Sequence, residues 1–178
     1  MLAYLLVLLA VLTRVLPHAG WFNFTAVTGG LIYFGARRSW REMLVPVVAL
    51  MATDFYLTTF VYHYSFQWPA YVTTWVWYAM AIGLGQILLH AKASFVRGAA
   101  AAILGPTSFF LLSNYGVWAG SGMYPHALAG LGACLWAGVP FYRNDLMATS
   151  IVLGAAFGIP ALVRRMSQGR AQMALAEK

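Results

Sequence analysis

Apolar residues along the chain form long runs separated by short links. A helix that crosses a membrane needs about 20 apolar residues. Six runs are predicted to be such helices: residues 2–17, 21–36, 43–61, 70–90, 98–119 and 146–163. A seventh run, residues 127–141, is short and rich in glycine, so we expect a re-entrant or surface helix that packs on protein. The pattern predicts an all-α integral membrane protein with six transmembrane helices.

Basic residues decide between six and seven crossings. They fall in three clusters beside the apolar runs: Arg37, Arg38 and Arg41; Lys92 and Arg97; Arg164, Arg165 and Arg170. Cytoplasmic loops are enriched in Lys and Arg, and six crossings put all three clusters in the cytoplasm together with both termini. Seven crossings with a weaker charge rule are the alternative. With six crossings, residues 1–165 are predicted to form one transmembrane domain and residues 166–178 a short cytoplasmic tail.

Composition supports the membrane assignment. Of 178 residues, 62% are hydrophobic and 8% charged, and the mean hydropathy is +0.73, whereas a soluble domain has about 25% charged residues. The net charge is +7, and the basic residues responsible for it lie beside apolar runs. We therefore expect a lipid bilayer and no nucleic acid as partner. The first run starts at Met1 without a basic segment and is read as a retained helix. Walker A and common hydrolase motifs are missing, so we expect no ATP hydrolysis and no enzyme.

Asp54 is one of four acids and lies midway along the run 43–61. Burying an ionised carboxylate inside a membrane costs free energy, so an aspartate at this position is by default a candidate functional residue. Arg14 is predicted to lie at a similar depth, near the outer end of the first helix. The two residues form a structural ion pair, or Asp54 serves a ligand, and the sequence leaves both open.

Three further expectations concern polar residues in the second half of the chain. Asn114 is expected to form a hydrogen bond between helices, and Cys134 to pack among small residues. Arg143 and Asp145 are expected to form an ion pair in a loop.

Polar and aromatic residues gather at the predicted outer ends of the helices. A small-molecule pocket has mostly apolar walls with a few placed polar groups, whereas an aromatic belt at the lipid headgroups would also explain the rings. The predicted ligand-binding residues are His18, Asn23, Asp54, His63, Gln67, Trp68, Tyr71, Asn114, Trp118 and Tyr124. We expect an outward-open pocket between residues 17–23, 62–71 and 113–126.

Several motifs carry a resemblance to known proteins. They are Asn23-Phe24-Thr25, Ala52-Thr53-Asp54, the stretch SNYGVW at 113–118 and the stretch GVPFYRN at 138–144. Over nearly its whole length the chain resembles a family of small bacterial membrane proteins. That family is distantly similar to the S-components of energy-coupling-factor vitamin transporters. The resemblance implies an S-component-like bundle in the bacterial inner membrane, with cytoplasmic termini and an outward ligand pocket.

The nearest analogy is to solitary vitamin B12 S-components of the BtuM type. These have a histidine in the first outer loop, an aspartate in the helix after the second, and a cobalt-ligating cysteine beyond it. His18 and Asp54 match the first two, but residues 62–71 contain no cysteine. His18 or His63 is then the candidate cobalt contact, because imidazole also suits such ions. The resemblance implies uptake of cobalamin or a related corrinoid, bound as transported ligand and not as an intrinsic cofactor.

Other functions stay open at this point. S-components dock an ATPase module through small residues on their first helix, and that pattern is not evident here, since Ala3 and Ala10 are seven positions apart. An integral membrane enzyme or accessory factor acting on a lipid or quinone would need an acid–base pair, Asp54 with His18 or His63. A structural subunit of a membrane complex would use the polar residues only to join helices.

Overall fold

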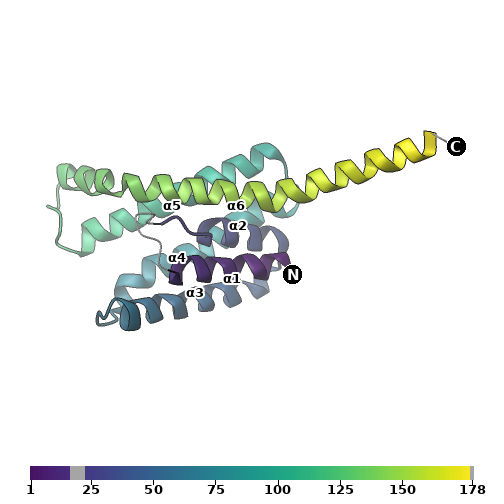
Figure 1. Ribbon diagram of the computed structural model, residues 1–178. Coiled ribbons are helices and arrows are strands. Elements are labelled where there is room, and N and C mark those ends of the chain that lie inside the picture. The colour runs from purple at the N-terminus through teal and green to yellow at the C-terminus, as the bar shows by residue number, and fades with distance from the viewer. Residues whose placement is uncertain (17–22, 177–178) are drawn as a thin grey trace.

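The computed structural model describes residues 1–16 and 23–176, with side chains to residue 169, and this part of the chain contains helices and no strand. Six α-helices follow one another (Figure 1): α1 Leu2–Val15, α2 Val27–Arg37, α3 Leu44–Tyr56, α4 Trp68–Gly85, α5 Phe95–Gly120 and α6 Leu128–Ala176. A 3₁₀ turn, η1 (Trp40–Glu42), precedes α3. One-turn π-helices, η2 (Leu57–Val61) and η3 (Gln86–His90), end α3 and α4.

Successive helices run in alternating directions, so the start of α1 and the later part of α6 lie at the same end of the bundle (Figure 1). The final turns of α6 extend beyond the other helices (Figure 1). The end of the bundle where α1 starts is called the basic end, and it carries residues 37–42, 91–97 and 164–165. The opposite end carries residues 57–68 and 113–127 and is called the aromatic end.

Side-chain contacts confirm that the basic clusters meet at one end. The Arg38 guanidinium lies 5.0 Å from the ring centroid of Tyr4 in α1. The Arg37 guanidinium lies 4.9 Å from the ring of Phe157 in α6. The ring of His90, at the end of η3, contacts the carboxyl end of α2 through a backbone carbonyl at 3.3 Å. The common side predicted from charge therefore exists as one end of the bundle.

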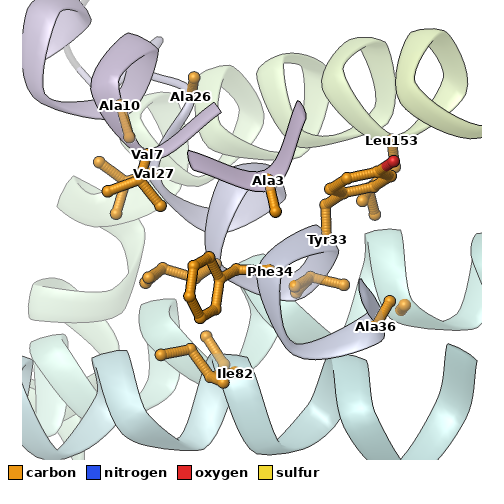
Figure 2. Packing of buried hydrophobic residues seen from close by; sticks show 14 of the residues in the cluster. Ala3, Val7, Ala10, Ala26, Val27, Tyr33, Phe34, Ala36, Ile82 and Leu153 are labelled. Carbon is orange, nitrogen blue, oxygen red and sulfur yellow. The ribbon is translucent and has the colours of Figure 1, made fainter. Parts of the chain in front are cut away.

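The short helix α2 lies at the centre, and its residues 27–36 are all buried. Phe34 and neighbouring side chains of α2 pack against α1, α4 and α6 (Figure 2). Two glycines allow α2 and α4 to touch through their backbones. A Cβ atom at Gly35 would lie 1.9 Å from the carbonyl oxygen of Ile82, and one at Gly85 would lie 1.9 Å from that of Ile32. Close approach of small residues is a common way to join helices in membranes.

Within the part of the chain that the structure describes, four helices are long and apolar enough to cross a membrane: Trp40–Val61, Trp68–His90, Phe95–Gly120 and Leu128–Gly169. The other two are shorter than expected. At 1.5 Å per residue, the 14 residues of α1 span about 21 Å and the 11 residues of α2 about 17 Å, against a hydrocarbon core of about 30 Å. Over residues 1–16 and 23–176 the protein is helical without strands, and its long apolar helices are typical of a membrane protein.

The last third of the chain differs from the prediction. The prediction of a separate re-entrant or surface helix over residues 127–141 was wrong, because one continuous helix, α6, runs from Leu128 to Ala176. Residues 138–142 lie against α5, where a Cβ atom at Gly138 would meet the Asn114 amide at 2.6 Å. The expected loop at residues 142–145 is helical because its acid, Asp145, is hydrogen-bonded inside the bundle.

The expected loop ion pair between Arg143 and Asp145 was also wrong. Both residues lie within α6, where side chains two positions apart do not face each other. Arg143 is exposed, whereas Asp145 is 4% exposed and faces α2.

Candidate functional site

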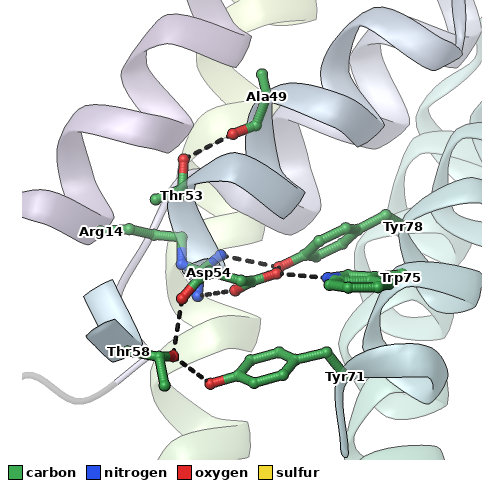
Figure 3. A network of polar contacts seen from close by, with 8 residues as sticks. All are labelled: Arg14, Ala49, Thr53, Asp54, Thr58, Tyr71, Trp75 and Tyr78. Atoms are coloured by element: carbon green, nitrogen blue, oxygen red, sulfur yellow. Dashed lines mark hydrogen bonds and ion pairs between the residues drawn. The ribbon is translucent and has the colours of Figure 1, made fainter. Parts of the chain in front are cut away.

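Asp54 is the centre of a polar network inside the bundle (Figure 3). Its side chain in α3 is 1% exposed, and its Oδ1 lies 2.6 Å from Arg14 Nη2. Its Oδ2 accepts hydrogen bonds from Trp75 Nε1 at 3.0 Å and from the Tyr78 hydroxyl at 3.1 Å. Arg14 Nη1 also donates to the Tyr78 hydroxyl at 2.8 Å. The predicted Arg14–Asp54 pair is confirmed, and α4 supplies two donors that the sequence analysis did not single out.

Hydrogen bonds of the Thr58 hydroxyl continue the network toward the aromatic end (Figure 3). Thr58 Oγ1 donates to the carbonyl oxygen of Asp54 at 2.8 Å and also contacts the Tyr71 hydroxyl. Thr58 lies in the π turn η2, and π turns are frequent at functional sites. The network therefore joins α1, α3 and α4, and it reaches the first turn of α4.

Three rings form an aromatic stack beside this network: Phe66, Tyr71 and Trp75. The Phe66 and Tyr71 rings are 5.0 Å apart and 16° from parallel. Trp75 lies 6.0 Å from Tyr71 and 6.2 Å from Phe66, within 25° of parallel. Trp75 and Tyr71 are held by their bonds to Asp54 and Thr58, so the stack is fixed before any ligand arrives. Planar, fixed rings are suited to stacking against a flat molecule.

Other large rings near the stack are exposed. They are Tyr62, Tyr64 and Trp68, with exposed fractions of 57%, 72% and 63%. His63, between the first two, has φ of 56°, and the amide of Tyr64 donates to the carbonyl oxygen of Thr58 at 2.9 Å. A residue in the left-handed region commonly ends a helix in this way. His63 therefore has a structural role in the turn that ends η2.

The second half of the aromatic end is formed by residues 113–127. Trp118 Nε1 donates to the carbonyl oxygen of Pro125 at 2.9 Å, and its ring lies 5.7 Å from that of His126. Tyr124 is half-buried beside them in the chain. The Trp118 bond fixes the turn between α5 and α6.

The ten predicted ligand-binding residues do not gather in one pocket. His18 lies outside the described residues. Two belong to the Asp54 network, Asp54 and Tyr71. Two line a small cavity beside Asp145, Asn23 and Asn114. Two lie near the end of α5: Trp118 in its last turn and Tyr124 in the turn that follows. Three are exposed, His63 and Gln67 between η2 and α4 and Trp68 at the start of α4.

Asp145 is the main polar residue that the sequence analysis misassigned. Its Oδ1 accepts hydrogen bonds from Thr28 Oγ1 at 2.7 Å and Thr149 Oγ1 at 3.2 Å. The adjoining cavity measures about 20 Å³ and is lined by Asn23, Pro106, Phe109, Phe110, Ser113, Asn114, Gly138, Phe141, Tyr142 and Asp145. Asp145 could have been found by the argument used for Asp54, because it is also an acid among apolar runs, with Thr149 one helical turn away.

The predictions for Cys134 and Asn114 are confirmed. Cys134 is 2% exposed and its Sγ lies 3.4 Å from the carbonyl oxygen of Asn114, across the α5–α6 contact. The Asn114 amide nitrogen donates to the carbonyl oxygen of Phe110 at 2.7 Å, and its Oδ1 lies 3.6 Å from Cys134 Sγ. Asn114 therefore bonds across the helix pair, and its amide is fixed with the oxygen toward α6.

A second cavity, of about 170 Å³, is apolar and lies between α1 and α6. It is lined by Leu9, Thr13, Phe24, Thr25, Ala26, Ala148, Ile151 and Val152. Neither cavity includes residues 62–71, and both are smaller than the 300–1,000 Å³ or so of typical ligand pockets. Within the described ranges, no group of three or more His, Cys, Asp or Glu side chains could hold a metal ion.

Comparisons with known proteins give one match. No curated protein and no solved structure matches the chain. A family model described as a family of unknown function, DUF6580, matches residues 1–172. Because the match covers nearly the whole chain, the protein belongs to this family of unknown function.

Proposed function

We propose that this protein is a substrate-binding membrane protein for uptake of a vitamin-like small molecule, with cobalamin or a related corrinoid as the first ligand class to test. In this proposal all six helices lie in the bacterial inner membrane. The basic end faces the cytoplasm, in keeping with the positive-inside rule. The aromatic end faces outward and captures the ligand.

The observation that carries the proposal is the aromatic stack fixed on the Asp54 network. Trp75 is oriented by its bond to Asp54, and the stack lies next to exposed rings of the same segment. Fixed rings lose little conformational entropy on binding, which favours affinity. Because the two cavities measure about 20 and 170 Å³, the proposed ligand lies on the rings of the aromatic end and not within these cavities.

The packing of α2 supports movement of the bundle as one unit. Backbone contact between α2 and α4 at Gly35 and Gly85 leaves no room for these helices to slide. We therefore propose capture at the outer face followed by reorientation of the whole bundle in the bilayer. Ala3 and Ala10 of α1 are 3% and 1% exposed, so they face the bundle and offer no surface to an ATPase module. The proposal is for a solitary component.

The test compares two exposed tryptophans at opposite ends of the bundle. Trp68 at the aromatic end is 63% exposed, and Trp40 at the basic end is 65% exposed, so they are matched in size and exposure. The purified protein in lipid nanodiscs is first examined for a co-purifying chromophore by visible absorbance. Binding of cyanocobalamin is then measured by tryptophan quenching and equilibrium dialysis.

Trp68→Ala should raise Kd about fivefold to tenfold, as expected for the loss of one stacked ring. Trp40→Ala should leave Kd unchanged. Absence of corrinoid binding by the wild-type protein at high micromolar concentration would reject the ligand class. Equal effects of the two substitutions would reject the aromatic end as the site.

A further inference from the structure

Among the described residues, Asp145 has no cationic partner like the one that Asp54 has. Two ion pairs are present among the described residues, Arg14–Asp54 and Arg38–Glu42, and neither includes Asp145. Thr28 and Thr149 donate hydrogen bonds to Asp145, but hydroxyl groups carry no net charge. A buried carboxylate without a cation is costly in an apolar environment, and more so within a membrane. A bound positive species would neutralise this carboxylate.

The cavity beside Asp145 has the size for one small ion. It measures about 20 Å³, and about 10–15 Å³ is enough to hold one water molecule. A proton on Asp145 would need no such space. The cavity therefore has room for one small ion beside the carboxylate.

Oxygen-bearing side chains line the cavity on several helices. Asn114 turns its amide oxygen toward α6, since its nitrogen is bound to the carbonyl oxygen of Phe110. Asn23, Ser113 and Asp145 are further lining residues, and each has a side-chain oxygen atom. Hard oxygen ligands suit alkali and alkaline-earth cations, and divalent Ca²⁺ sites commonly use several carboxylates. One carboxylate among neutral oxygens matches a single positive charge.

We propose that Asp145 binds a monovalent metal cation in this cavity, with Na⁺ as the probe. The bound ion neutralises Asp145 and joins α5 to α6 through Asn114 and Asp145, while Thr28 of α2 donates a hydrogen bond to the same carboxylate. This inference does not depend on the proposed uptake function, because ion binding can be measured on the protein alone.

The test measures thermal unfolding of the purified full chain in detergent as a function of NaCl. Choline chloride keeps the ionic strength constant, and KCl and LiCl series report selectivity. Binding to the folded state alone raises stability by RT ln(1 + [Na⁺]/Kd). At ten times Kd, Tm should rise by about 3–6 °C for a chain of this length. Equilibrium binding of ²²Na⁺ should give one ion per chain.

Two substitutions with matched controls locate the ion. Asp145→Asn keeps the shape but removes the charge, so it should fold and lose the Na⁺-dependent rise in Tm. Gly138→Ala should weaken the effect, because its Cβ would lie 2.6 Å from Asn114 Oδ1. Glu42→Gln removes a carboxylate at the basic end, and Gly132→Ala adds a methyl group on α6 where no atom lies within 4 Å. Both controls should keep the full rise.

Three outcomes would overturn the proposal. The first is a wild-type Tm that is the same in NaCl and in choline chloride. The second is a Na⁺ effect that survives in Asp145→Asn or remains at full size in Gly138→Ala. The third is stabilisation by lowered pH that requires Asp145 but not Na⁺, which would show that a proton neutralises the carboxylate.

Discussion

Replacing Asp54 by asparagine tests whether its carboxylate stabilises the fold. The substitution keeps the size of the side chain and removes the charge that faces Arg14 at 2.6 Å. The new NH₂ group also cannot accept a hydrogen bond from Arg14, Trp75 or Tyr78, whichever it faces. The variant therefore leaves a guanidinium without its anion inside the bundle.

The size of the effect follows from burial. Removing one partner of a buried ion pair costs about 3–5 kcal/mol. The Arg14 side chain is 22% exposed and can be partly hydrated, so the lower value applies. A loss of about 3 kcal/mol raises the ratio of unfolded to folded protein more than a hundredfold. Equilibrium unfolding by SDS in detergent micelles, followed by circular dichroism, measures this change.

The control and a double substitution complete the test. Glu42→Gln breaks the exposed pair with Arg38 and should leave the free energy of unfolding close to wild type. Arg14→Met combined with Asp54→Leu removes both charges, and it should be more stable than Asp54→Asn alone. If Asp54→Asn unfolds within about 1 kcal/mol of wild type, or if the double variant is no more stable than Asp54→Asn, the stabilising role of the pair is refuted.

Three other predictions concern packing, topology and the ligand. Gly85→Ala should destabilise the fold strongly in the same SDS titration, because its Cβ would lie 1.9 Å from a carbonyl oxygen of α2, whereas Gly83→Ala has open space and should be neutral or stabilising. Maleimide added to intact cells should label a cysteine placed at Ser65 at the aromatic end and not one at Ser167 at the basic end; labelling of the latter position would reverse or reject the orientation. If an imidazole of the aromatic end ligates cobalt, His63→Ala should change the visible spectrum of bound corrinoid, and an unchanged spectrum with retained binding excludes this contact.

The sequence by itself determined the environment, the helical class and the two ends of the molecule. Long apolar runs leave few alternatives to membrane helices, since backbone polar groups must be paired within the lipid. The basic clusters marked one end correctly, because charged residues at helix ends avoid the hydrocarbon whatever the packing. The sequence placed Asp54 and Arg14 at a similar depth and left open whether they pair, and the structure shows the pair.

Only the tertiary structure decided where each helix ends within the apolar sequence. It also decided which polar side chains contact one another. Residues 142–145 are polar and were read as a loop, but Thr28, more than a hundred residues away, bonds Asp145 and keeps α6 continuous. Tyr78 and Trp75 looked like ordinary aromatic residues of a membrane helix until α4 brought them to Asp54. Such contacts depend on which face each helix turns inward. In helices that are apolar all round, hydrophobic periodicity does not mark that face.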